Sequence, residues 1–197
     1  MSAGAVSDGS RATGLKLAFD PFGRISRNTG LLLVLGVVVA GLLLARLGVR
    51  FDGFLDLHTP GHRVSFRTAL ADQFVAVPLS VAVAWLVARP FRAKPDFTDL
   101  LIAIGVARIP TVLGAPIITL LTPDPTRLAE LLANPKSPSP LLLLVAAIAI
   151  PIVAWHIALL VFGLRHATAL GGTRLAAAVV SIIVAAEIVS KLVLIAL

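Results

Sequence analysis

The chain has 197 residues, of which 58% are hydrophobic, and it carries a formal net charge of +7. Its mean hydropathy of +0.99 comes from stretches of about 17–25 apolar residues, which are long enough to cross a bilayer and exclude an ordinary soluble domain. The basic residues flank these stretches without interleaved aromatic residues, which favours lipid headgroups over nucleic acid, and the absence of cysteine excludes disulfides and thiolate chemistry.

Residues 1–29 form a polar stretch before the first apolar run, which spans Gly30 to Leu47. The stretch lacks the short basic start of a secretory signal, and no small-residue cleavage site follows the run. We therefore expect the run to be a retained membrane anchor. A connection follows, and the second run spans Ala69 to Ala88 before a group of basic residues and proline ends it.

The third run spans Phe97 to Leu121, and Asp96 is placed to cap it. Asp99 follows the capping residue by three positions, as in a capping box. A proline-rich loop separates this run from the fourth, Leu141 to Leu164, and two glycines precede the fifth, Leu175 to Leu197.

Each run must be helical, because the hydrocarbon core offers the backbone no other hydrogen-bond partners and the runs lack the alternation of a β-barrel. The sequence therefore predicts an all-α membrane bundle of five transmembrane helices over residues 30–197, with residues 1–29 as a polar cytoplasmic tail. Basic residues number nine on the side of the N-terminus and six on the other, and the nine include the two shortest loops. This bias predicts a cytoplasmic N-terminus and an outward C-terminus.

Four prolines lie inside the predicted spans: Pro78, Pro110, Pro116 and Pro151. Proline removes a backbone donor and tends to kink a helix, so these residues could break helices around a cavity, as in transporters. The interpretation we favour is that they are ordinary membrane prolines, which neighbouring helices accommodate. The third span carries two of them and is the best candidate for irregular structure.

Charged and polar side chains inside the spans are the candidate site, because a charge at the centre of a bilayer costs on the order of 2.5–3.5 kcal/mol. At about 1.5 Å per residue, Arg108, His156 and Glu187 fall in one central layer, about 12–18 Å from the cytoplasmic end. Asp72 and Lys191 fall together nearer the outer interface. We expect Arg108 to pair with Glu187 beside His156, and Glu187 can also pair with Lys191 four residues along the helix.

These groups have two interpretations. They hold the helices in register, or His156 and Glu187 form a path for protons or ions. If a charge swap between Arg108 and Glu187 is no more stable than either single change, the pairing is wrong.

Other chemistry finds little support in the sequence. Asp56, His58 and His62 could suggest a metal site, but Pro60 and Gly61 interrupt any helix that would align the histidines, so we expect no metal. We also expect no catalytic residues and no cofactor, because no nucleophile elbow and no glycine-rich phosphate loop is present. We expect residues 52–57 to form a short interfacial helix.

Residues 96–110 contain Asp96, Gly105, Val106, Arg108 and Pro110 in a pattern that resembles the third helix of the Yip family of membrane proteins. Trp155 and the residues 163–166 and 173–176 are similar to that family's junction between its fourth and fifth helices. The resemblance covers roughly residues 89–197. It implies five spans, a cytoplasmic N-terminus and a link to Rab-type GTPases and vesicle traffic in eukaryotic members.

Two departures argue against carrying GTPase binding over to this chain: Val106 stands where the family has tyrosine, and the N-terminal tail is short. Arginine far outnumbers lysine and tyrosine is absent, which is typical of a GC-rich prokaryotic genome and of a protein of the cytoplasmic membrane. We expect a non-enzymatic membrane protein that organises lipids, membrane-protein partners or further copies of itself. The alternative is a small transporter or channel subunit that uses Arg108, His156 and Glu187.

Overall fold

The structure is a computed structural model that describes residues 14, 17–51, 53–55, 64–91, 93, 95–123, 126 and 139–196. Within these residues, five helices are long and apolar enough to cross a membrane. They confirm the predicted all-α membrane bundle and its five spans.

The first two spans differ in regularity. Helix α2 (Arg27–Ala45) begins where the Ser26 hydroxyl accepts a hydrogen bond from the backbone N–H of Thr29. The second span runs through α3 (Phe66–Phe74), a π-helical segment η1 (Val75–Leu79), α4 (Ser80–Ala88) and a short 3-10 segment η2 (Arg89–Phe91). Helices α2 and α3 each begin about three residues before the predicted apolar run, because a capping residue and the residues after it extend the helix beyond its apolar part.

The third span is interrupted. It consists of α5 (Phe97–Ala107) and α6 (Ile109–Leu121), and Arg108 stands in the turn between them. The predicted cap is confirmed, because the Asp96 carboxylate accepts hydrogen bonds from the backbone N–H groups of Thr98 and Asp99. The last two spans are the uninterrupted helices α8 (Pro140–Thr168) and α9 (Gly172–Ala196).

The four prolines have different consequences. Pro78 lies in η1, and Pro110 is the second residue of α6, directly after the break at Arg108. The third span is therefore irregular, as the sequence predicted. Pro116 and Pro151 lie inside α6 and α8, which remain helical through them.

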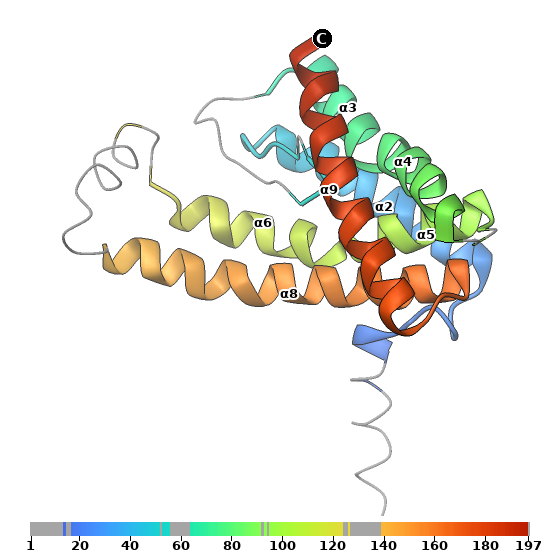
Figure 1. Cartoon of the computed structure of the whole chain (residues 1–197). Helices are drawn as coiled ribbons and strands as arrows, with labels where there is room; N and C mark the ends of the chain where they lie inside the picture. The colour runs from blue at the N-terminus through green and yellow to red at the C-terminus, as the bar shows by residue number, and fades with distance from the viewer. Residues whose placement is uncertain are drawn as a thin grey trace, which may run out of the picture.

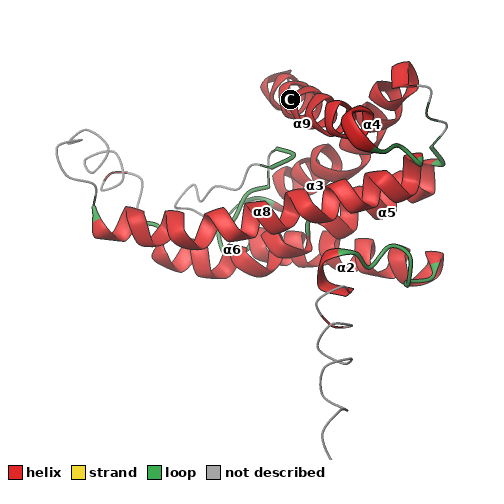
Figure 2. Cartoon of the chain, turned by 60° about the horizontal axis from the view of Figure 1, so that its bottom comes forward, coloured by secondary structure: helices red, strands yellow, loops and turns green. Residues whose placement is uncertain are grey.

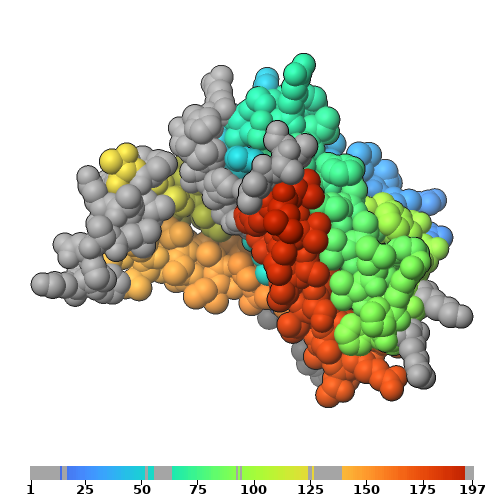
Figure 3. Space-filling view, turned by 45° about the horizontal axis from the view of Figure 1, so that its top comes forward, coloured from blue at the N-terminus to red at the C-terminus, as the bar shows by residue number. Residues whose placement is uncertain are grey.

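The helices form a bundle with an extended arm (Figures 1 and 2). Helices α4, α5 and α9 and the second half of α8 enclose the largest hydrophobic core, and α2 packs beside α5. Figure 3 shows α9 lying against α4 on one face of the molecule. Residues 116–121 of α6 and 140–151 of α8 lie side by side and extend away from α4 and α9, and we call this pair the α6–α8 arm.

Glycine permits the closest helix contacts. A Cβ atom on Gly163 of α8 would lie 2.8 Å from the Cβ and 3.0 Å from the Cα of Ala103 on α5. A Cβ atom on Gly105 of α5 would lie 2.5 Å from a methyl of Val34 on α2. Small residues at these points let the backbones approach as membrane helices commonly do.

The segment before α2 also packs on the bundle. Phe22 is 5% exposed and lies beside Gly163, and the backbone oxygen of Ala18 accepts a hydrogen bond from the indole N–H of Trp155. Residues 17–22 therefore run back along α8 and do not lead directly away from it. The polar part of the predicted tail, residues 1–13, lies outside the described residues.

Candidate functional site

The first connection folds into the bundle and forms the centre of the candidate site. Val49, Phe51 and Phe54 are at most 1% exposed, and Phe54 belongs to the main hydrophobic core. Gly53 to Leu55 form a bend, which corrects the interfacial helix expected over residues 52–57 as far as that range is described. Buried aromatic side chains pull the backbone of this connection inward, so its amide groups need partners inside the protein.

Arg108 satisfies the carbonyl groups of this segment. Its side chain is 1% exposed, and Nη1 donates hydrogen bonds to the backbone oxygens of Phe54 at 3.0 Å and Gly53 at 3.3 Å, with Ala76 at 3.5 Å. The guanidinium carbon also lies 5.6 Å from the centre of the Phe51 ring. The break between α5 and α6 places the residue here, at the level of the connection and of η1.

Glu187 of α9 satisfies the amide groups of the same segment. Its Oε2 atom accepts hydrogen bonds from the backbone N–H of Phe54 at 3.0 Å and of Leu55 at 3.4 Å. Its Oε1 atom lies 3.9 Å from the ammonium nitrogen of Lys191, which confirms the predicted pair within the helix. The side chain of Glu187 is 34% exposed and that of Lys191 41%.

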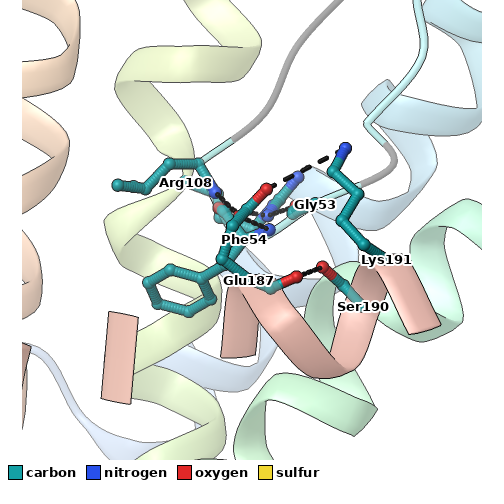
Figure 4. A network of polar contacts seen from close by, with 7 residues as sticks. Gly53, Phe54, Arg108, Glu187, Ser190 and Lys191 are labelled. Atoms are coloured by element: carbon teal, nitrogen blue, oxygen red, sulfur yellow. Dashed lines mark hydrogen bonds and ion pairs between the residues drawn. The ribbon is translucent and has the colours of Figure 1, made fainter. Parts of the chain in front are cut away.

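The expected direct ion pair between Arg108 and Glu187 is wrong for the residues that the structure describes. Figure 4 shows Arg108, from the turn between α5 and α6, and Glu187, from α9, reaching one backbone segment. The arginine donates to its carbonyl groups, and the glutamate accepts from its N–H groups. The prediction placed both charges at a common height and missed the peptide groups that lie between them.

His156 is also placed differently from the prediction. It is 1% exposed, and its Nδ1 atom lies 2.8 Å from the hydroxyl of Thr111 on α6. In the described chain its polar partner is therefore Thr111, and neither Arg108 nor Glu187. Its ring lies 6.0 Å from that of Phe54, so it also lines the buried connection.

Asp72 makes a separate ion pair. Its carboxylate, 2% exposed, accepts two hydrogen bonds from Arg50, at 2.9 Å from Nε and 2.7 Å from Nη2. The predicted outer layer of Asp72 and Lys191 therefore divides into two pairs, Arg50 with Asp72 and Glu187 with Lys191. Sequence reasoning treated Arg50 as a flanking charge and missed its role, because the fold of the connection decides which carboxylate it reaches.

A third charged group lies at the other end of the helices. Arg27 donates a hydrogen bond to Asp96, and its Nη2 atom lies 3.4 Å from Asp99. The hydrogen bond from Arg27, followed by that from Thr98, lowers the pKa of Asp96 below its usual 3.8. These contacts join the first residues of α2 and α5, and His166 of α8 lines the same small hollow.

The residues that the structure describes form no metal site. Asp56, His58 and His62 lie outside the described residues, and no group of three histidine, aspartate or glutamate side chains gathers elsewhere in the described chain. The described chain contains an apolar cavity of about 380 Å³ and a smaller one of about 80 Å³. Neither is lined by Arg108, His156 or Glu187.

A family described as the Yip1 domain matches residues 17–195. No curated protein and no solved structure matches the chain.

Proposed function

Because the chain belongs to the Yip1 domain family of integral membrane proteins, which are generally not enzymes, we propose that it organises protein partners or lipids within the membrane without catalysing a reaction. The observation that carries the proposal is the set of hydrogen bonds made by the charged and polar side chains inside the spans. Arg108 and Glu187 bind the backbone of Gly53 to Leu55, and His156 binds Thr111. Groups engaged in holding the fold support a structural role over a conducting one.

The shape of the apolar surface supports the same proposal. The α6–α8 arm carries large exposed apolar side chains, among them Ile117, Leu120, Leu143 and Ile150, which are 51–86% exposed. Such side chains are at home in lipid, and they also offer a long face to another membrane helix. The partners that fit are therefore bilayer lipid, a membrane protein or a second copy of this chain, and we do not propose a small GTPase.

We further propose a prokaryotic cytoplasmic membrane as the location, with the N-terminus inside. The excess of basic residues on the side of the N-terminus supports this orientation. The natural chain has no cysteine, so single cysteines test it directly. Ser139→Cys should react with a membrane-impermeant thiol reagent added to intact cells, whereas Leu170→Cys should react only after lysis; the reverse pattern would overturn the orientation.

Proteoliposome flux tests the proposed function against its transport rival. The purified chain and a Glu187→Gln variant are reconstituted in vesicles that hold pH- and ion-sensitive dyes, with Asp99→Asn as a control outside the buried site. We expect no flux above that of empty vesicles for any of them. A flux that the parent and the control show and the Glu187→Gln variant lacks would overturn the proposal.

Association within the bilayer gives a positive test. A fluorophore attached at Ile150→Cys on the α6–α8 arm reports energy transfer between copies in proteoliposomes, and Leu86→Cys on α4 serves as the control site. If copies associate through the arm, energy transfer should persist as lipid is added. It should also be stronger for the label at residue 150 than for the label at residue 86. Transfer that falls to the random-encounter level at both sites would remove self-association from the proposal.

A further inference from the structure

An apolar cavity of about 380 Å³ lies between α2, α5, α6 and α8 and the segment that precedes α2. Its walls include Leu33, Val106, Ile109, Trp155 and Leu159, and Leu17 lines it from the segment before α2. The volume lies within the range of about 300–1,000 Å³ typical of ligand pockets. No buried charge described above takes part in it.

The cavity lies at the depth of the hydrocarbon core. The contacts of Arg27 with Asp96 and Asp99 place the starts of α2 and α5 together. From there, Leu33 is about 9 Å along α2 and Val106 about 13 Å along α5, at 1.5 Å per residue. At this depth the acyl chains of bilayer lipids surround the protein on every side.

The segment before α2 covers the cavity on one side. The indole N–H of Trp155 donates to the backbone oxygen of Ala18 at 2.8 Å, and the Phe19 ring lies 6.3 Å from the indole ring. Leu17 is 46% exposed and Leu33 36%, so the cavity reaches the surface between them. A flexible chain can therefore enter beside these leucines and lie beneath the segment.

The chemistry of the walls selects a hydrocarbon occupant. The lining side chains named above are aliphatic or aromatic, and the one indole N–H among them is already bonded to Ala18. Such walls offer water no hydrogen-bond partners, and an apolar wall without contacting atoms loses its dispersion energy. We propose that this cavity binds an acyl chain of a membrane phospholipid, which residues 17–22 cover as a strap.

The site gives a structural basis for the lipid part of the proposed function. Its biological role rests on that proposed function, but its existence does not. A conducting protein could carry the same site, so the two ideas can fail separately. Flux that depends on Glu187 would overturn the organising role and leave acyl-chain binding standing. Loss of the binding signal described next would overturn the site alone.

Fluorescence of Trp155 reports occupancy directly. The chain has two tryptophans, so Trp85→Phe leaves Trp155 as the only fluorophore and keeps an aromatic ring on α4. This background is kept in detergent micelles, which contain no phospholipid, and is titrated with phosphatidylcholine that carries bromine on one acyl chain. We expect a saturable quenching component at low brominated fraction, in addition to quenching that rises with the bulk composition.

Matched substitutions separate the site from surrounding lipid. Val106→Phe adds a ring to the wall of the cavity, and Val39→Phe makes the same change at a 46% exposed position on α2. We expect loss of the saturable component in the first variant and its retention in the second. If Val106→Phe lowers the helical content, we use Leu33→Phe in its place, because Leu33 also lines the cavity. Its control is then Leu35→Phe, since Leu35 is 58% exposed.

Two results would overturn the proposal. One is a quenching curve that follows bulk composition alone in the parent background. The other is a saturable component that survives both cavity-filling changes in folded protein. A component that weakens as the amount of protein per micelle rises would identify a second copy as the occupant, because the copy carries no bromine, and it would count against an acyl chain.

Discussion

Exchanging the charges of Arg108 and Glu187 tests whether the two side chains meet each other or share a backbone segment. In a direct ion pair, the swapped variant Arg108→Glu with Glu187→Arg keeps the attraction and recovers much of the stability lost by either single change. In the observed arrangement it cannot, because the new glutamate would face the carbonyl groups of Gly53 and Phe54. The new arginine would face the N–H groups of Phe54 and Leu55.

The expected loss follows from the hydrogen bonds. Arg108 donates to Phe54 at 3.0 Å and to Gly53 at 3.3 Å, and two charge-assisted hydrogen bonds contribute about 3–6 kcal/mol. The bond from the Phe54 N–H to Glu187 at 3.0 Å contributes about 1.5–3 kcal/mol more. The swap should therefore lower the free energy of unfolding by about 5–9 kcal/mol, against a typical total of about 5–15 kcal/mol.

Equilibrium unfolding in mixed detergent micelles, followed by helical circular dichroism as denaturing detergent is added, measures these losses. Glu187→Gln is the mild reference, because the amide oxygen still accepts from Phe54 and only the charge is lost, at about 1 kcal/mol. We expect the parent, Glu187→Gln, each charge reversal and the swap to follow in order of decreasing stability. A swap more stable than either reversal would refute the shared-backbone arrangement and restore the direct pair.

Three further predictions use the same unfolding measurement or its dependence on pH. Gly163→Ala should cost about 1–3 kcal/mol, because its Cβ meets the backbone of α5, while Gly36→Ala, which has open space around it, should gain about 0.5–1 kcal/mol; equal effects would contradict the close packing. Asp72→Ala should cost about 3 kcal/mol, since it leaves a partly buried arginine without its carboxylate, and a neutral effect would show that the pair adds nothing. The lowered pKa of Asp96 means that its contact with Arg27 stabilises the fold above the usual value of 3.8 and is lost as pH falls through the lower folded value; Asp96→Asn should remove that dependence, and an unchanged profile would exclude the contact as its source.

The helices were predictable because hydrocarbon restricts the backbone so strongly. A run of apolar residues at least 18 long has to be a helix there, and all five runs are. The cap at Asp96 and the irregular third span also followed from local rules, since capping and proline act within a few residues. These features need no knowledge of which helix lies beside which.

The partners of the buried charges were not predictable in the same way. Counting residues along each helix gives a height, and the heights of Arg108 and Glu187 were a sound basis for bringing them to one level. The count carries no information about a connection that folds inward between them. Phe51, Phe54 and Leu55 signalled an apolar segment, but its burial depends on the space that the helices leave.

The inward fold of Gly53 to Leu55 also sets an order of assembly. This segment leaves the ribosome early, between the first and second spans, whereas Glu187, which accepts its N–H groups, belongs to the fifth. Until α9 has inserted, Phe54 and Leu55 must leave those amide groups to water or to temporary contacts. A segment that is synthesised early therefore obtains its hydrogen-bond partner only from the last helix. The chain thus cannot insert as a series of helix pairs that each fold completely before the next pair is made.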